Sequence, residues 1–261
     1  MRTLKLAWNF LRIGIANQMQ YRANFFTQLL TSFINLATGL IGLLLVFSYT
    51  TTLDGWTQPE LLAGMGVYIL MGGIIHSAIQ PNMERFMDDV HEGTLDFAFT
   101  KPVDSQVIVS IREFNFWQLV DVIVGLVIMG ISIYQMHGQL TVLNGLAFIL
   151  ALFLGAVMIY CFWMIVTTSA FWLIRIYNIV DLFQGLYAAG RWPVSIYPSW
   201  LRIGLTFLIP VAFAVTIPAE SLTARLTPLT LLGESALTVF FIILSRVIWR
   251  IGVRHYSGAS A

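Results

Sequence analysis

The stretch PNMERFMDDVHEGTLDFAFTKPVDSQVIVSIREFN, residues 81–115, is the one long polar interruption in an otherwise apolar chain. It holds seven of the 13 acidic residues of the protein, namely Glu84, Asp88, Asp89, Glu92, Asp96, Asp104 and Glu113. The sequence on both sides is typical of membrane-spanning helices. This polar block therefore marks where the chain meets water.

The composition sets the class of protein. The chain has 261 residues, of which 58% are hydrophobic and 10% charged, with a mean hydropathy of +0.81. Soluble domains carry about 25% charged residues, so these values indicate an all-α polytopic membrane protein. The single cysteine, Cys161, lies in an apolar run and reads as a small buried hydrophobe.

The first 22 residues predict an amphipathic helix. Leu4, Trp8, Leu11, Ile15 and Met19 follow helical spacing along one face, with Lys5, Asn9, Arg12 and Gln20 on another. Arg12 and Arg22 interrupt any signal-peptide core, so no cleavable leader is expected. We expect a helix in the membrane interface, the alternative being a cytosolic helix docked on other spans.

Hydropathy predicts six spans of about 20 residues, the length needed to cross a bilayer. They are Phe25–Phe47, Leu61–Ile79, Phe116–Tyr134, Leu143–Ile165, Ala170–Ala189 and Leu229–Ile251. The second span is rich in small residues, which permit close helix packing in lipid: Gly64, Gly66, Gly72, Gly73 and Ala78.

Within the polar block, an apolar stripe at helical spacing predicts a second amphipathic helix. The stripe consists of Met83, Phe86, Met87 and Val90. Asn82 is expected to cap its start and Gly93 to end it, and Asp104 or Ser105 to cap a further short helix. The stripe must be covered, either by lipid headgroups or by another protein.

Residues 191–227 are punctuated by proline. Pro210 falls in the middle of the apolar run Trp200–Ile217, where it removes a backbone donor and clashes with the preceding turn. Two half-helices that enter and return on one side are therefore expected, rather than a crossing.

Basic residues set the expected topology. Arg2, Lys5, Arg12 and Arg22 precede the first span, and Arg246, Arg250 and Arg254 mark the end of the last. By the positive-inside rule both termini are expected in the cytoplasm, which requires an even number of crossings and places residues 81–115 there too. Arg191, Arg202 and Arg225 would then lie outside the cytoplasm, and these three arginines count against this topology.

No catalytic constellation is expected in this chain. The sequence lacks a GxxxxGK[ST] phosphate loop, an HExxH helix, a GxSxG elbow and a Cys/His cluster with zinc spacing. Among the ionisable residues within the predicted spans, His76, Asp121 and Asp181 are candidates for a functional role. His76 could be a proton-sensitive group or could form a hydrogen bond between helices. Asp121 and Asp181 could belong to an ion pathway or could be solvated near the ends of their spans.

Two stretches together resemble the permease subunit of type 2 ABC transporters. They are EGTLDFAFTKPVDSQ (Glu92–Gln106) and RWPVSIYPSWLRIGLTFLIPVAFAVTIPAESL (Arg191–Leu222). The first is similar to that family's coupling loop and the second to its proline-broken re-entrant pair. The six-span layout with a basic amphipathic N-terminal helix is also similar, and this layout covers the whole chain.

The resemblance implies site residues in three regions. Docking of an ATP-binding subunit is implied for Met83, Phe86, Met87, Val90, Glu92, Gly93, Leu95 and Asp96. An interfacial helix that approaches that subunit is implied for Lys5, Trp8, Leu11, Arg12 and Ile15. An external gate is implied for Pro193, Pro198, Trp200 and Pro210.

The resemblance also implies the activity. The chain would be the permease of an ATP-driven exporter in the cytoplasmic membrane, moving a small-molecule or amphipathic substrate. It would bind no cofactor itself, while a partner subunit would bind ATP and Mg²⁺. A second permease copy and membrane lipids complete the expected partners, with no nucleic acid. The few charges within the spans argue against a strongly charged cargo.

The expected organisation is a single permease domain, residues 1–261. Its parts are the interfacial helix 1–22, spans one and two at 25–79, the coupling loop 81–115, spans three to five at 116–189, the external re-entrant region 191–227 and span six at 229–251. An ion-coupled secondary transporter and a membrane scaffold without an ATPase remain as alternatives, although no internal duplication supports the former.

Overall fold

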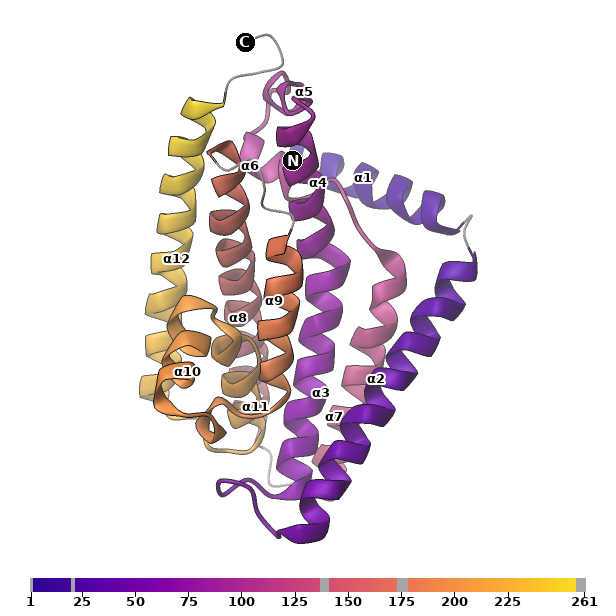
Figure 1. The fold of residues 1–261 in the computed structure, drawn as a ribbon, viewed down its shortest axis with the longest axis vertical. Helices are drawn as coiled ribbons and strands as arrows, with labels where there is room; N and C mark the ends of the chain where they lie inside the picture. The colour runs from indigo at the N-terminus through magenta and orange to yellow at the C-terminus, as the bar shows by residue number, and fades with distance from the viewer. Residues whose placement is uncertain (1, 20–21, 137–140, 173–177, 257–261) are drawn as a thin grey trace.

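A computed structural model describes residues 2–19, 22–136, 141–172 and 178–256, and every regular element in these ranges is a helix. The long helices run roughly parallel to one another, while α1 lies across one end of the bundle (Figure 1). Their bounds are α1 Arg2–Met19, α2 Arg22–Tyr49, α3 Gln58–Ile74, α4 Gln80–His91, α7 Leu119–Gln135, α8 Val142–Thr168, α9 Asn178–Ala188 and α12 Pro228–His255. The shorter helices are α5 Asp96–Phe99, α6 Ser105–Val109, α10 Ser199–Ile203 and α11 Ile217–Leu222.

Five helices in the described ranges are long and apolar enough to cross a membrane, or six if one bent pair counts as a span. They are Ala23–Tyr49, Gln58–His91, Phe116–Gln135, Val142–Phe171 and Pro228–His255. Five of the six predicted spans are thereby found at or near their predicted positions. The predicted fifth span differs: α9 has 11 residues, fewer than the roughly 20 that a crossing needs, and residues 173–177 lie outside the described part.

The second span is longer than its sequence pattern predicts. α3 continues through a π-helical segment, η1 (Ile75–Ile79), directly into α4, which gives 34 helical residues from Gln58 to His91. The predicted cap at Asn82 is therefore wrong, because Asn82 lies inside this continuous helix. Its amide instead donates to the carbonyls of Ala78 and Glu113, both at 2.7 Å, and accepts from the Glu113 N–H.

Small residues bring α3 and α7 together, as predicted for the second span. A Cβ placed on Gly125 would lie 2.6 Å from the backbone nitrogen of Leu70, and one on Gly66 would lie 2.7 Å from Cγ of Met129. Two backbones approach this closely only where at least one position lacks a side chain. The α3–α7 pair is therefore one closely packed unit of the bundle.

The proline-broken region forms two helical arms that meet at a bend of 80°, Ser199–Leu208 and Ala212–Leu222. Ile209, just before Pro210, is extended with φ −121° and ψ 102°, because a proline ring disfavours the helical conformation of the residue before it. In Figure 1, α1 and the C-terminal end of α12 lie at the top of the bundle, and both arms lie in its lower half. The break is the one predicted from Pro210.

Candidate functional site

The end of the bundle near the two termini carries the turn that the sequence singled out. The helix α4 ends at His91, and Gly93 has a φ of +70°, a left-handed conformation that glycine adopts without strain. The carbonyl of Asp89 then accepts the N–H groups of Thr94 and Leu95, at 2.9 and 3.3 Å. These bonds hold residues 92–96 as a fixed corner at the tip of the 34-residue helix.

Asp89 organises this corner, a role that sequence reasoning missed. Its carboxylate is buried and lies 2.6 Å from the guanidinium of Arg112 and 3.3 Å from that of Arg85. It also accepts a hydrogen bond from the Thr94 hydroxyl at 3.0 Å. A buried charge is tolerated only when it is paired in this way. The acidic run held a usable signal, since Arg85 stands four residues before Asp89 on one helical face.

Most of the apolar residues predicted to dock a partner are buried inside the chain itself. Met83, Phe86 and Leu95 are inaccessible, Met87 is 6% exposed, and Val90 packs partly buried against the core. The ring of Phe86 meets those of Phe171 and Trp249, 5.6 and 5.2 Å away between centroids. The expectation that headgroups or another protein cover this stripe is therefore corrected: the chain's own helices cover it.

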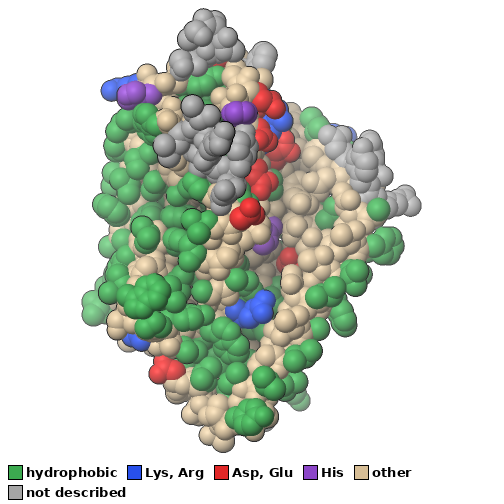
Figure 2. All heavy atoms as spheres, in the orientation of Figure 1, with side chains coloured by type: hydrophobic (Ala, Val, Ile, Leu, Met, Phe, Trp, Pro, Cys, Tyr) green, Lys and Arg blue, Asp and Glu red, His purple; other side chains and the backbone are tan. Residues whose placement is uncertain are grey.

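The exposed side chains of the corner are acidic. Glu92 and Asp96 are exposed, with Gly93 half-buried between them, and Asp88 is exposed beside them on the last turn of α4. Figure 2 shows acidic side chains gathered in the upper half of this face, the half in which α4 and α5 lie in Figure 1. What a partner can reach here is a carboxylate surface on a rigid turn.

α1 lies against the segment that follows the corner. The amide of Gln18 donates to the carbonyl of Phe114 at 2.9 Å and accepts the N–H of Phe116 at 2.7 Å, and Lys101 lies over the ring of Phe10 at 5.2 Å. Of the predicted interfacial residues, Trp8 and Arg12 are exposed and Leu11 and Ile15 half-buried, whereas the side chain of Lys5 lies outside the described part.

A short helix ties the corner to the last span. As predicted, Asp104 caps α6 by accepting the N–H groups of Gln106 and Val107. Its carboxylate also pairs with the guanidinium of Arg246 in α12, which bonds Gln106 as well at 2.7 Å. The hydrogen bonds from Arg246 lower the pKa of Asp104 below its usual value, despite partial desolvation.

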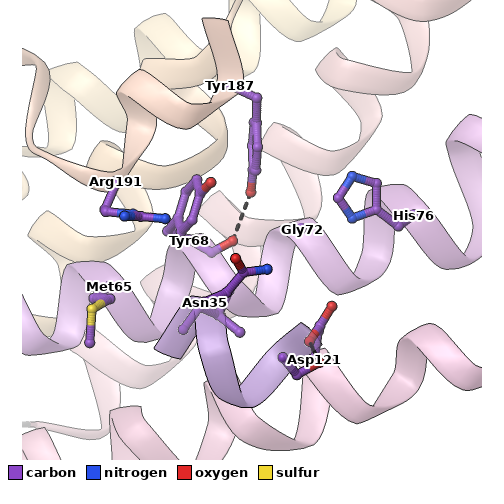
Figure 3. A pocket seen from close by; sticks show the side chains of 10 residues that line it. Asn35, Met65, Tyr68, Gly72, His76, Asp121, Tyr187 and Arg191 are labelled. Carbon is purple, nitrogen blue, oxygen red and sulfur yellow. Dashed lines mark hydrogen bonds between the residues drawn. The ribbon is translucent and has the colours of Figure 1, made fainter. Parts of the chain in front are cut away.

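A polar cavity of about 110 Å³ lies inside the bundle between α2, α3, α7 and α9. Arg191 lies beside the ring of Tyr68 at one end, and His76 and Asp121 lie at the other (Figure 3). Figure 2 shows this face hollowed, with a histidine, an acidic and a basic side chain around the hollow. A volume of this size has room for several water molecules.

Two of the ionisable residues predicted within spans meet in this cavity. Asp121 accepts hydrogen bonds from Ser32 and, at 3.0 Å, from Gln28, so it joins α7 to α2. His76 makes no hydrogen bond to any residue that the structure describes, in contrast to the interhelical bond that was one of its two interpretations. Asp181 is exposed on α9, away from both.

The predicted gate residues divide by burial. Pro193 and Pro210 are buried at bends of the chain, whereas Pro198 and Trp200 are exposed at the start of α10. Arg202 bonds the carbonyl of Ser195 at 2.6 Å and thereby closes the turn between them. No side chain of this group seals a channel within the described chain.

These features define a multi-pass, all-helical membrane protein with a rigid acidic corner at one end and a proline-broken arm at the other. A family model described as ABC-2 family transporter protein matches residues 33–260, most of the chain. The chain therefore belongs to the ABC-2 family of transporter membrane proteins, as its resemblance to type 2 ABC permeases predicted. Membrane proteins of this family generally leave ATP hydrolysis to a partner subunit. Comparisons with curated proteins and with solved structures gave no match.

Proposed function

We propose that this chain is the permease subunit of an ATP-driven exporter and that the corner at residues 92–96 receives the motion of a separate ATP-binding subunit. The observation that carries the proposal is the continuous helix Gln58–His91, whose tip is that corner. A force applied at Glu92 or Asp96 is carried along one rigid element to the opposite end of the bundle.

The corner is built to transmit force rather than to absorb it. The paired Asp89 and the left-handed Gly93 fix its shape, and the buried stripe at Met83 and Phe86 locks α4 onto α8 and α12. A partner that pushes on the exposed carboxylates would move these helices together. Basic side chains on the partner would suit this surface best.

The rest of the assembly follows from this division of labour. ATP and Mg²⁺ would be bound by the partner, a second permease copy would complete the pathway, and α1 would lie along lipid headgroups with its basic side chains toward the partner. The proline-broken arms at the far end would form the external gate. Both termini would be cytoplasmic, in the cytoplasmic membrane.

The arginines that counted against this topology have local partners. Arg202 is held by backbone carbonyls, Arg225 by Glu60, and Arg191 by the ring of Tyr68. Arginines fixed in this way are part of the fold of the far end. Their number there is therefore a weaker guide to orientation than the basic residues of the termini.

An ion-coupled mechanism is the second candidate, carried by the cavity in which His76 and Asp121 meet. An intramembrane carboxylate beside a histidine and water is the arrangement that proton pathways use. It predicts transport without an ATP-binding partner.

Co-purification distinguishes the ATP-driven mechanism from the ion-coupled one. The chain is isolated from its own cells in mild detergent, as wild type and with Glu92→Lys and Asp96→Lys combined, and the accompanying proteins are identified. The control adds two lysines at the opposite end, Thr51→Lys and Thr52→Lys. We expect an ATP-binding protein with the wild type and the control but not with the corner variant. Transport by a chain that brings no ATP-binding protein under any mild condition would contradict the proposal.

A further inference from the structure

Glu234 is a carboxyl group for which the fold supplies no partner. It lies in α12, fully buried, and neither of its side-chain oxygens has a hydrogen-bond partner in the described residues. Leaving a polar group in apolar surroundings without a hydrogen bond is costly, and leaving a charge there is far more so. Sequence reasoning missed this residue because it stands alone in an apolar run.

The surroundings of Glu234 contain a cavity. About 600 Å³ of space lies between α12 and the two arms of the proline-broken region, and Glu234 is one of the residues that line it. Its walls are otherwise almost entirely apolar, with Phe207, Phe213, Ile217 and Phe240 the largest. Phe207 and Phe240 are each more than half exposed, so the cavity opens on the outer surface of the bundle.

Among the residues that the structure describes, no charged group acts on this carboxyl. The elements packed against α12 are α8, whose titratable residues are Tyr160 and Cys161, and the turn Ser169–Phe171, which has none. The arm Ala212–Leu222, which lines the cavity, carries Glu220. The hydroxyl of Tyr160 bonds Ser110, Cys161 faces Ser245, and Glu220 interacts with Arg225. Within the described chain, Glu234 therefore carries either a proton or a cation that comes from elsewhere.

We propose that this cavity binds a lipophilic organic cation, whose positive group displaces the proton of Glu234 while its apolar body fills the space beneath the bent arms. The volume lies within the range of small-molecule sites, and such sites combine apolar walls with a few polar groups that fix orientation. A metal ion does not suit the cavity, because hard cations need several oxygen ligands and a single carboxylate is present.

This site revises the expectation that the spans exclude a charged cargo. One buried carboxylate is enough to select a monovalent cation when the remaining contacts are apolar. Calling the ligand a cargo rests on the proposed function. Binding of the ligand does not depend on the proposed function, and this binding can be measured without ATP or a partner subunit.

The test is equilibrium binding of rhodamine 6G, a lipophilic monocation, to the purified full-length chain in detergent, followed by fluorescence polarisation. Nile red, which is neutral, serves as the comparison probe. Because one proton leaves as one cation binds, we expect the affinity of the wild type for rhodamine 6G to rise with pH, by up to tenfold per unit. Glu234→Gln is expected to lower that affinity at least tenfold, to abolish its pH dependence and to leave Nile red binding unchanged.

Two further variants keep the result interpretable. Glu220→Gln removes a neighbouring carboxyl that does not line the cavity and is expected to bind like the wild type. Gly233→Leu adds bulk at the cavity wall and is expected to abolish binding, whereas Gly130→Leu, on open surface of α7, is not. Absence of rhodamine 6G binding by the wild type at pH 8, or equal binding by Glu234→Gln, would overturn the proposal.

Discussion

Arg225 Nη2 lies 2.7 Å from Glu60 Oε2, across 165 positions of sequence. The same guanidinium donates to the carbonyl of Gly55 at 2.7 Å and lies over the ring of Trp56 at 4.8 Å. Glu60 in turn accepts the Thr57 N–H at the start of α3. The exit of the proline-broken region is thereby fastened to the loop before the second span.

We predict that Arg225→Ala loosens this far end. The pair is bidentate but partly exposed, so its loss is expected to lower stability by about 1 kcal/mol. The measurement is a double-mutant cycle of thermal unfolding with Glu60→Gln. A double variant that loses the full sum of the two single losses would contradict a direct interaction.

Gly125→Val is predicted to separate α3 from α7. A Cβ at Gly125 meets backbone atoms of Leu70, which cannot move without their helix, and overpacking of this kind costs roughly 1–3 kcal/mol. Gly130→Val on the same helix meets nothing within 4 Å and is the matched control. Equal melting temperatures for the two variants would show that the helices do not pack at this glycine.

Asp89→Asn is predicted to be among the most destabilising single changes in the corner. It leaves the guanidinium of Arg112 buried without its carboxylate, and breaking a buried pair from one side costs on the order of 3 kcal/mol. The exposed neighbour Asp88→Asn is the control and is expected to change stability by less than about 0.5 kcal/mol. Thermal unfolding of the two variants in detergent measures the difference, and similar losses would remove the role assigned to Asp89.

The pair between Asp104 and Arg246 predicts an acid-sensitive tie. Because the folded protein lowers the pKa of Asp104, the resulting stability is fully present above the usual value of 3.8 and is lost as pH falls through the lowered one. The difference in stability between the wild type and Asp104→Asn should therefore be constant near neutral pH and vanish in strong acid. A difference that persists unchanged in strong acid would contradict an electrostatic origin.

Composition and hydropathy were sufficient to predict an all-helical membrane protein and five of its long helices, because bilayer thickness fixes the length of an apolar span. The bend at Pro210 and the cap at Asp104 were also predictable, since each follows from one residue's backbone chemistry. The absence of a helix boundary at Asn82 was not predictable. A local capping signal there is overridden by distant bonds to the segment around Glu113.

The residues predicted to dock a partner show what hydrophobic periodicity cannot predict. The spacing of Met83, Phe86 and Met87 identifies an apolar face, but it does not say whether that face meets a partner or the chain's own core. Phe171 and Trp249 cover it from far along the sequence. The cavity around His76 and the lone carboxyl of Glu234 depend likewise on contacts among helices that no local pattern encodes.

The proposed function requires a separate ATP-binding protein to bind at the corner, residues 92–96. Its most direct test is photo-crosslinking in the native cells from benzoylphenylalanine placed at position 92, with the same group at position 54, at the opposite end, as the control. We expect an adduct with an ATP-binding protein from position 92 and none from position 54. An adduct with that protein from position 54 alone, or none from position 92, would contradict it.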